Sequence, residues 1–313
     1  MRHGKKQVAT VLVVPCYNEE HRLVSAAFID FLADSGGYFI LFVDDGSRDQ
    51  TVSKLNAIKL AAGADSVEVM SLSENRGKAE AIRQGIQKVL SKDFRHAKSV
   101  RFVGYLDADL AAPICEFERL VDVASRHPKI QVVLGARLSL SGHAVHRKLA
   151  RNLIGKTFSY IASRLIGIPV HDTQCGAKLF RFGNWLEKIF EHEFSDRWLF
   201  DVEILARVKK FYGANASSVV FECPLESWQE IGGSRLKLRD FLKAPIGLLG
   251  LVVKYRLPGM RAVNLRGAAA PATEARVFND LLTISEKSVH ANGSSQSDLD
   301  PYAIPTETGR RAA

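Results

Sequence analysis

The chain has 313 residues, a formal net charge of +9 and a sequence pI near 9.4. Its content of 46% hydrophobic and 25% charged residues is ordinary for a globular protein with a sizeable core. The positive charge predicts an anionic partner. Because the basic residues are dispersed and no zinc finger, recognition helix or RNP-like string is present, we expect no nucleic acid partner. An anionic membrane surface and phosphate-bearing substrates fit this charge better.

The cysteines and the apolar stretches constrain where the protein lies. The four cysteines are far apart and form no C-x-x-C pair: Cys16, Cys115, Cys175 and Cys223. We therefore expect neither a disulfide framework nor a zinc site, and a reducing cytoplasmic setting. The apolar run after residue 7 is too short for a signal peptide, and the stretch 244–253 is too short for a membrane span. These features favour the cytosol, and they indicate that any contact with a membrane is peripheral and at its cytosolic face.

Short apolar runs and helical patterns alternate along the first half of the chain. The apolar runs predict strands buried on both faces at 11–14, 39–43, 66–72, 100–106 and 131–134. The intervening patterns predict helices at 20–33, 50–62, 78–90 and 116–126. This repeated β-α unit predicts an α/β fold with an open, mostly parallel, Rossmann-like sheet and helices on both faces.

Polar clusters follow three of the predicted strands. They occupy residues 15–20, 44–47 and 107–109. Ligands of open parallel sheets bind at the carboxyl ends of the strands, which meet at one edge. The sequence therefore predicts a binding site at that edge.

Asp107 and Asp109 are two residues apart at a strand end, so their carboxylates can face a common point. Hard oxygen ligands of this kind suit Mg²⁺ or Mn²⁺, which would also hold a substrate diphosphate. The alternative is a pair of turn-forming or helix-capping aspartates. Asp45 and Glu19 at the same edge favour the metal site.

The other clusters carry groups suited to a nucleotide. In the first loop, Tyr17 can cover a base, and Glu19 can accept hydrogen bonds from a base or ribose. Asp45 could read the edge of uracil or guanine. Residues 75–78 open a predicted helix, whose N-terminus suits a phosphate or an acidic partner. Arg137 follows a later strand and can bind a phosphate in bidentate fashion.

The chain changes character after the predicted sheet. At 145–168 basic and apolar residues interleave at helical spacing, which predicts an amphipathic helix. This helix would either pack on the sheet or, together with 244–253, face a membrane. Residues 262–313 are a low-complexity segment that we expect to be disordered, with one short helix at 277–284.

The motifs PCYNEE, VDDGSRDQT, NRGKAEAIRQG, LDADL and DTQCGAKLF occur in this order. Their combination resembles the family 2 inverting glycosyltransferases, and most of all the dolichyl- or polyprenyl-phosphate β-glucosyltransferases. The resemblance spans residues 8–237. It implies a GT-A type twisted sheet in a catalytic domain at 1–261. The nucleotide-sugar half would be at about 8–136 and the acceptor half at about 137–261.

The resemblance also implies roles for individual residues. Nucleotide binding is assigned to Pro15, Tyr17, Asn18, Glu19, Val43, Asp45, Lys78, Asp107 and Ala108. Asp107 and Asp109 would hold the metal, Arg137 and Arg235 would contact the acceptor phosphate, and Asp107, Asp109 and Arg137 would be catalytic. Two positions depart from the pattern. Ala111 stands where many mannosyl-transferring relatives carry Gln, and Gln229 stands where an Arg is often found.

The resemblance implies transfer of a hexose, with glucose from UDP-glucose favoured, to dolichyl or polyprenyl phosphate. A single displacement would give a β-linked lipid-phosphate sugar. A phosphate acceptor is already anionic, so Asp201 and Glu203 would anchor the site rather than abstract a proton. The alternatives are mannose transfer from GDP-mannose, transfer to a sugar hydroxyl in polysaccharide synthesis, and a nucleotide-sugar-binding protein without catalysis.

Overall fold

The computed structural model describes residues 8–138, 144–146, 149–231 and 238–255. The chain divides into two units, Met1–Ala262 and Val263–Ala313, and every described residue lies in the first. The predicted tail at 262–313, its helix at 277–284 and Arg235 lie outside the described residues.

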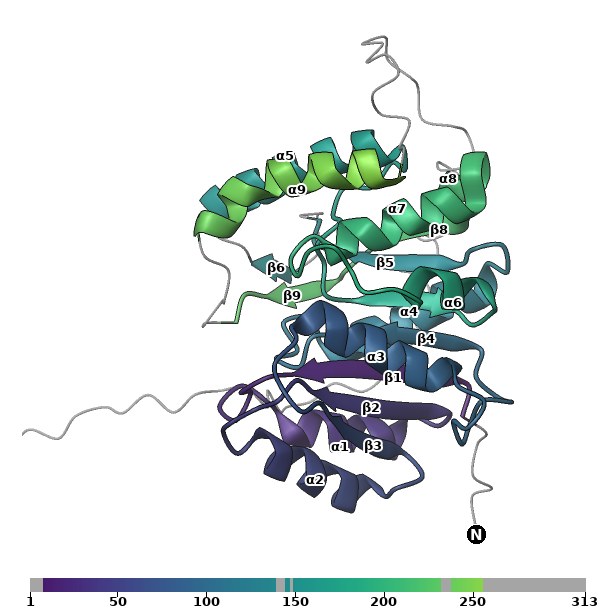
Figure 1. The fold of residues 1–313 in the computed structure, drawn as a ribbon. Coiled ribbons are helices and arrows are strands. Elements are labelled where there is room, and N and C mark those ends of the chain that lie inside the picture. The colour runs from purple at the N-terminus through teal and green to yellow at the C-terminus, as the bar shows by residue number, and fades with distance from the viewer. Residues whose placement is uncertain (1–7, 139–143, 147–148, 232–237, 256–313) are drawn as a thin grey trace, which may run out of the picture. The chain divides into compact units, whose positions relative to one another are not determined.

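Within the described residues the core is a seven-stranded sheet of order β3-β2-β1-β4-β7-β5-β8 (Figure 1). Its strands are β1 Thr10–Cys16, β2 Tyr38–Asp44, β3 Val67–Ser71, β4 Phe102–Tyr105, β5 Val132–Ala136, β7 Lys178–Arg181 and β8 Val220–Pro224. The paired strands are parallel except for β7, which is antiparallel to both β4 and β5. This confirms the predicted open, mostly parallel sheet.

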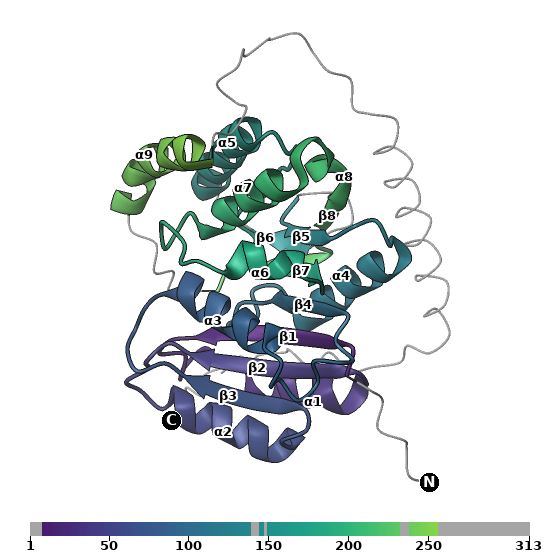
Figure 2. The ribbon, with the colours of Figure 1, turned by 45° about the vertical axis from the view of Figure 1, so that its right-hand side comes forward.

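Helices cover both faces of the sheet (Figure 2). The larger ones are α1 Ser25–Asp34, α2 Thr51–Ala62, α3 Lys78–Leu90, α4 Ile114–Arg126 and α7 Phe200–Tyr212, and shorter segments are α6 Trp185–Phe190, η1 Gly213–Asn215 and α8 Ala216–Val219. Alternate side chains of each strand serve the two faces. In β2, Phe42 packs edge-on against Phe28 of α1, whereas Val43 points to α3 on the other side. This double burial explains why the strands are continuous apolar runs.

The first predicted helix begins later than expected, at Ser25 instead of residue 20. The backbone N–H groups of Arg22 and Leu23 both donate to the Glu19 carbonyl, and the Arg22 guanidinium pairs with the Glu19 carboxylate at 2.5 Å. These bonds hold a separate turn between β1 and α1. The turn keeps Glu19 at the sheet edge.

The amphipathic stretch is also divided differently from the prediction. Residues Ala144–His146 form strand β6, which pairs with β9 Ser227–Gln229 in a small parallel sheet, and helix α5 spans only Leu149–Ile166. Helix α9, Leu238–Tyr255, contains the apolar stretch 244–253 and lies beside α5 over α7 (Figures 1 and 2).

No helix within the described ranges is long and apolar enough to cross a membrane.

The contact between β4 and β7 leaves no room for a side chain at Gly104. An added Cβ would lie 2.2 Å from the Lys178 carbonyl oxygen and 2.8 Å from the Phe117 ring. We therefore expect Gly104→Ala to lower the free energy of unfolding by about 1–3 kcal/mol. Urea unfolding followed by circular dichroism measures this loss.

Gly250→Ala in α9 is the matched control, because nothing lies within 4 Å of its Cβ position. Replacing a helical glycine by alanine should leave stability unchanged or raise it by about 0.5–1 kcal/mol. Equal losses for the two variants would contradict a packing constraint at Gly104.

Candidate active site

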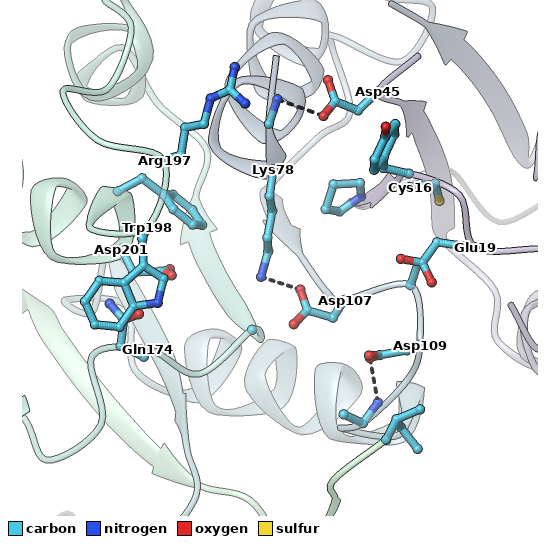
Figure 3. Close-up of a pocket in the computed structure, with 18 of the residues that line it drawn as sticks. Cys16, Glu19, Asp45, Lys78, Asp107, Asp109, Gln174, Arg197, Trp198 and Asp201 are labelled. Atoms are coloured by element: carbon cyan, nitrogen blue, oxygen red, sulfur yellow. Dashed lines mark hydrogen bonds and ion pairs between the residues drawn. The ribbon is translucent and has the colours of Figure 1, made fainter. Parts of the chain in front are cut away.

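The carboxyl ends of β1, β2, β4 and β5 open onto a pocket of about 890 Å³ (Figure 3). Most of the predicted site residues line it: Pro15, Tyr17, Glu19, Asp45, Lys78, Asp107, Ala108, Asp109 and Arg137. The short segment before β7 and the start of α7 close the other side of the pocket. The structure therefore gathers residues from both halves of the described chain at one edge of the sheet.

Two of the predicted residues do not line this pocket. The Val43 side chain is fully buried against α3, near Gly85. Asn18 has a left-handed backbone with φ of 47°, and its side-chain oxygen accepts a hydrogen bond from the Arg48 N–H at 2.8 Å. Asn18 therefore shapes the loop between β1 and α1.

The D-x-D carboxylates are held differently from each other. The Lys78 ammonium lies 2.5 Å from Oδ1 of Asp107 (Figure 3). Asp109 accepts a hydrogen bond from the Ala111 N–H at 3.2 Å and pairs with Arg22 at 3.3 Å. Burial, and secondarily the Asp107 carboxylate, raise the pKa of Asp109 above its ordinary value.

The backbone before β7 presses directly on the D-x-D. A Cβ added to Gly176 would lie 2.2 Å from Oδ2 of Asp107. A larger residue at 176 would therefore displace this carboxylate. The glycine of the DTQCG motif is required by this close approach.

The D-x-D suits a metal site in which the protein supplies some of the ligands and a bound substrate supplies the others. Among the described residues no group of three His, Cys, Asp or Glu side chains could hold a metal ion. Two carboxylates facing an open pocket are nonetheless the donor set that Mg²⁺ uses when substrate phosphates supply further ligands. The side chains of Asp107 and Asp109 therefore fit a divalent cation only together with a bound diphosphate.

Asp45 fixes the turn that begins α3. Its two carboxylate oxygens accept hydrogen bonds from the N–H groups of Arg76 and Gly77, both at 2.8 Å. Gly77 has φ of 97°, which a residue with a side chain rarely adopts. Burial raises the pKa of Asp45, against the effect of these two backbone hydrogen bonds. Asp45 thus positions Lys78 as well as lining the pocket.

Arg137 is clamped by a residue to which the sequence assigned no role. Its Nε and Nη2 donate to the two oxygens of Asp172 at 2.7 and 2.8 Å, and its backbone N–H donates to Asp172 at 3.0 Å. The guanidinium also lies over the Trp228 ring, 5.4 Å from its centroid. Burial lowers the pKa of Arg137, but Asp172 raises it further, so the arginine remains charged.

A second buried ion pair lies under the pocket. The Lys178 ammonium, fully buried, donates to Oδ1 of Asp201 at 2.6 Å and to the Cys175 carbonyl at 2.7 Å. The Tyr105 hydroxyl donates to the same Asp201 oxygen. A lysine inside the short apolar stretch Ala177–Phe180 was the sequence signal that could have revealed this pair.

Glu203 anchors the segment that forms the pocket's far wall. Its carboxylate accepts hydrogen bonds from the Ser195 N–H at 2.7 Å, from Arg207 at 2.9 Å and from the Tyr255 hydroxyl at 2.6 Å. The side chain is fully buried and does not line the pocket. Cys175 is likewise buried, and burial raises the pKa of its thiol to about 11, as expected for a structural cysteine.

Part of the far wall is apolar and reaches helix α9. The residues of this apolar part are Trp198, Leu199, Trp228, Ile231 and Ala244. Trp198 packs against Phe158 of α5, with ring centroids 5.1 Å apart. The pocket therefore joins a charged wall at the sheet edge to an apolar wall beside α5 and α9.

Comparison with known proteins agrees with this arrangement. Residues 11–190 match the model of the family described as Glycosyl transferase family 2. The dolichyl-phosphate beta-glucosyltransferase of Drosophila melanogaster is 31% identical over 271 residues, which cover 82% of this chain and 78% of the relative. The Saccharomyces cerevisiae protein of the same name is 30% identical over 272 residues, which cover 80% of this chain and 76% of that relative.

A solved structure shows the same fold. It is the crystal structure of glucosyl-3-phosphoglycerate synthase from Mycobacterium tuberculosis in complex with Mn²⁺, UDP-glucose and phosphoglyceric acid. Its TM-score is 0.56 at 17% identity, over 80% of this chain and 81% of that one. The GT-A type fold implied by the motifs is confirmed. Because the family model covers more than half of the chain and these relatives match most of it, the chain belongs to glycosyl transferase family 2.

Proposed function

We propose that this glycosyltransferase moves glucose from UDP-glucose to dolichyl or polyprenyl phosphate and produces a β-linked lipid-phosphate sugar. The observation that carries the proposal is the pocket itself. It brings the D-x-D and Lys78 into one pocket with Arg137, and it continues into an apolar wall that includes Ala244 of α9. The names of the relatives support glucose as the transferred sugar and dolichyl phosphate as the acceptor.

The charged wall suits the diphosphate of the donor. Lys78 lies beside Asp107, where its ammonium can contact a phosphate oxygen while remaining paired. Burial lowers the pKa of Lys78, but the carboxylates of Asp107 and Asp201 raise it, so it stays charged. When bound at Asp107 and Asp109, Mg²⁺ or Mn²⁺ would neutralise charge on the leaving diphosphate. Pro15, Tyr17, Glu19, Asp45 and Ala108 then surround the nucleotide.

Arg137 suits the acceptor phosphate, with Arg235 as its second predicted contact. The Asp172 clamp leaves the guanidinium fixed before any substrate arrives, and a fixed cation orients an attacking anion efficiently. In the displacement, a phosphate oxygen of the acceptor forms a bond to the anomeric carbon while the bond to the UDP oxygen breaks. This single step inverts the anomeric centre.

The lipid acceptor requires contact with a membrane, and α5 and α9 provide a surface for it. Large apolar side chains on these helices are 46–75% exposed: Tyr160, Ile161, Ile246, Leu249 and Val253. Arg164 lies over the Tyr160 ring at the same surface. Because moving a polyprenyl chain into water costs about 0.8 kcal/mol per CH₂ group, the enzyme must come to the lipid. We propose that it binds the cytosolic face of the membrane peripherally.

The proposed transfer is tested by incubating the purified chain with radiolabelled UDP-glucose or GDP-mannose, polyprenyl phosphate and Mn²⁺ or Mg²⁺. We expect a lipid-linked product from UDP-glucose. Asp109→Ala should lower the rate of transfer about a hundredfold or more, because the metal that would hold the diphosphate loses a protein ligand. Asp122→Ala is the control, since Asp122 forms an exposed helical pair with Arg126. Efficient transfer to a soluble sugar acceptor, with none to the lipid, would favour the polysaccharide alternative.

Metal-dependent binding should weaken at acidic pH. The raised pKa of Asp109 means that its carboxylate gains a proton at a higher pH than an ordinary aspartate, and a protonated carboxyl is a poor metal ligand. The gain in UDP affinity given by Mn²⁺ should therefore decline as the pH falls from neutral. Calorimetric titrations with and without Mn²⁺ measure it. An Mn²⁺ effect that persists in Asp109→Ala would contradict this role.

Membrane binding is tested by flotation with anionic liposomes. The wild-type protein should float at low salt and be partly released at high salt. The double variant Ile161→Ser/Ile246→Ser should float at least about tenfold less, because each buried apolar side chain contributes about 1.5–3 kcal/mol. Leu60→Ser on α2 is the control, an exposed apolar residue on another helix. Equal flotation of all three proteins would show that the surface of α5 and α9 does not bind the membrane.

A further inference from the structure

The pocket contains a carboxamide whose nitrogen has no acceptor in the described part of the chain. The side-chain nitrogen of Gln174 is buried and lacks a hydrogen-bond partner among the described residues. Gln174 nevertheless lines the pocket, in the segment between Asp172 and Gly176 (Figure 3). A buried amide nitrogen without an acceptor is costly, so a ligand that supplies one is expected here.

Asp201 offers the complementary group. Its Oδ1 takes both protein donors, Lys178 and Tyr105, while its Oδ2 accepts no hydrogen bond from the described part of the chain. Asp201 also lines the pocket, at the first turn of α7. Oδ1 of this carboxylate is therefore anchored below the pocket, and Oδ2 is available to accept a hydrogen bond from a ligand.

The anchor is rigid. Tyr105 and Lys178 are direct partners in the pairing of β4 with β7, in the middle of the sheet. Lys178 is fully buried and Asp201 is only 3% exposed. Replacing a buried ion pair by apolar residues of similar volume is often neutral or stabilising, so a gain in stability alone is a weak reason for this pair.

We infer that Asp201 and Gln174 form the subsite for the hydroxyl groups of the transferred hexose, and that Lys178 and Tyr105 are positioning residues for Asp201. A sugar hydroxyl donates one hydrogen bond and accepts others, so it matches a carboxylate oxygen beside an amide N–H. The inference rests on the proposed function for the identity of the sugar.

The location agrees with this assignment. The Lys78 ammonium, paired with Asp107, lies 5.8 Å from the ring of Phe200, the residue before Asp201. Gly176, two residues after Gln174, packs against Asp107. The hydroxyl subsite therefore adjoins the diphosphate wall, as it must when the hexose is bonded to the diphosphate.

The same geometry removes Asp201 from the role of a general base. If Asp201 took a proton from an acceptor, the buried Lys178 ammonium would lose its counter-charge. An acceptor that arrives already ionised, such as a phosphate, needs no proton transfer to Asp201.

The experiment compares UDP-glucose with UDP by calorimetry in the presence of Mn²⁺, using the full chain. Asp201→Asn and Gln174→Met should each weaken UDP-glucose binding about tenfold and change UDP binding less than about twofold. Asp122→Asn is the matched control and should change neither. Equal weakening of UDP and UDP-glucose would show a general structural defect and would overturn the inference.

Lys178→Met tests the positioning role. It should weaken UDP-glucose binding as much as Asp201→Asn does, and the double variant should be no weaker than either single one, because all three remove the same contact. Lys188→Met, at an exposed lysine, is the control. If Lys178→Met fails to fold, the double variant, which lacks both charges, and Asp201→Asn decide the question. Additive losses in a folded double variant would overturn the positioning role.

Kinetics separate binding from proton abstraction. With polyprenyl phosphate, Asp201→Asn should raise the KM for UDP-glucose and keep the wild-type pH profile of kcat. A large loss of kcat at saturating UDP-glucose, with unchanged KM and a lost acidic limb, would make Asp201 a base and overturn the inference. A further outcome is that the variants weaken UDP-glucose binding more than UDP binding in a protein that does not transfer glucose to polyprenyl phosphate. This result would support the hexose subsite and refute the proposed acceptor.

Discussion

The antiparallel pairing of β7 between β4 and β5 determines how this site is built. The other pairings in the sheet are parallel, so their carboxyl ends meet at one edge. A strand of opposite direction brings its amino end to that edge, and with it Gln174 and Gly176. The glycines make the contact possible, because Gly104 admits the β7 backbone and Gly176 admits the Asp107 carboxylate.

Three ion pairs lie in or directly beneath the pocket. Lys78 is paired with Asp107, Arg137 with Asp172 and Lys178 with Asp201. The first two cations also line the pocket and can contact phosphates, whereas Lys178 is sealed beneath it. Each pair fixes a charged group before the substrate binds. Such preorganisation limits the ordering that binding or reaction would otherwise require.

Local patterns in the sequence predicted the sheet edge but not its long-range partners. The apolar runs revealed β1, β2 and β4, and so the loops with Asp45 and Asp107. Strand β7 escaped prediction because it is four residues long and carries Lys178, whose burial depends on Asp201 far along the chain. The sequence pattern did not indicate strand β6 ahead of helix α5. The partner of β6, strand β9, lies more than eighty residues later in the chain. The resemblance assigned Val43 to the nucleotide, and the motif alone did not indicate that its side chain faces α3.

Helix α9 links the proposed membrane surface to the chemistry. Ile246 and Leu249 face outward, while Ala244 lines the pocket and Gly247 packs against Leu199 of the far wall. Glu203 ties the end of the same helix, through Tyr255, to Ser195 at the start of that wall. A helix resting on lipid would therefore hold the apolar wall at the membrane. In the proposed reaction, the phosphate of a membrane-borne acceptor would then approach Arg137 while its hydrocarbon chain stayed in the bilayer, and the fold would join an aqueous donor to an insoluble acceptor.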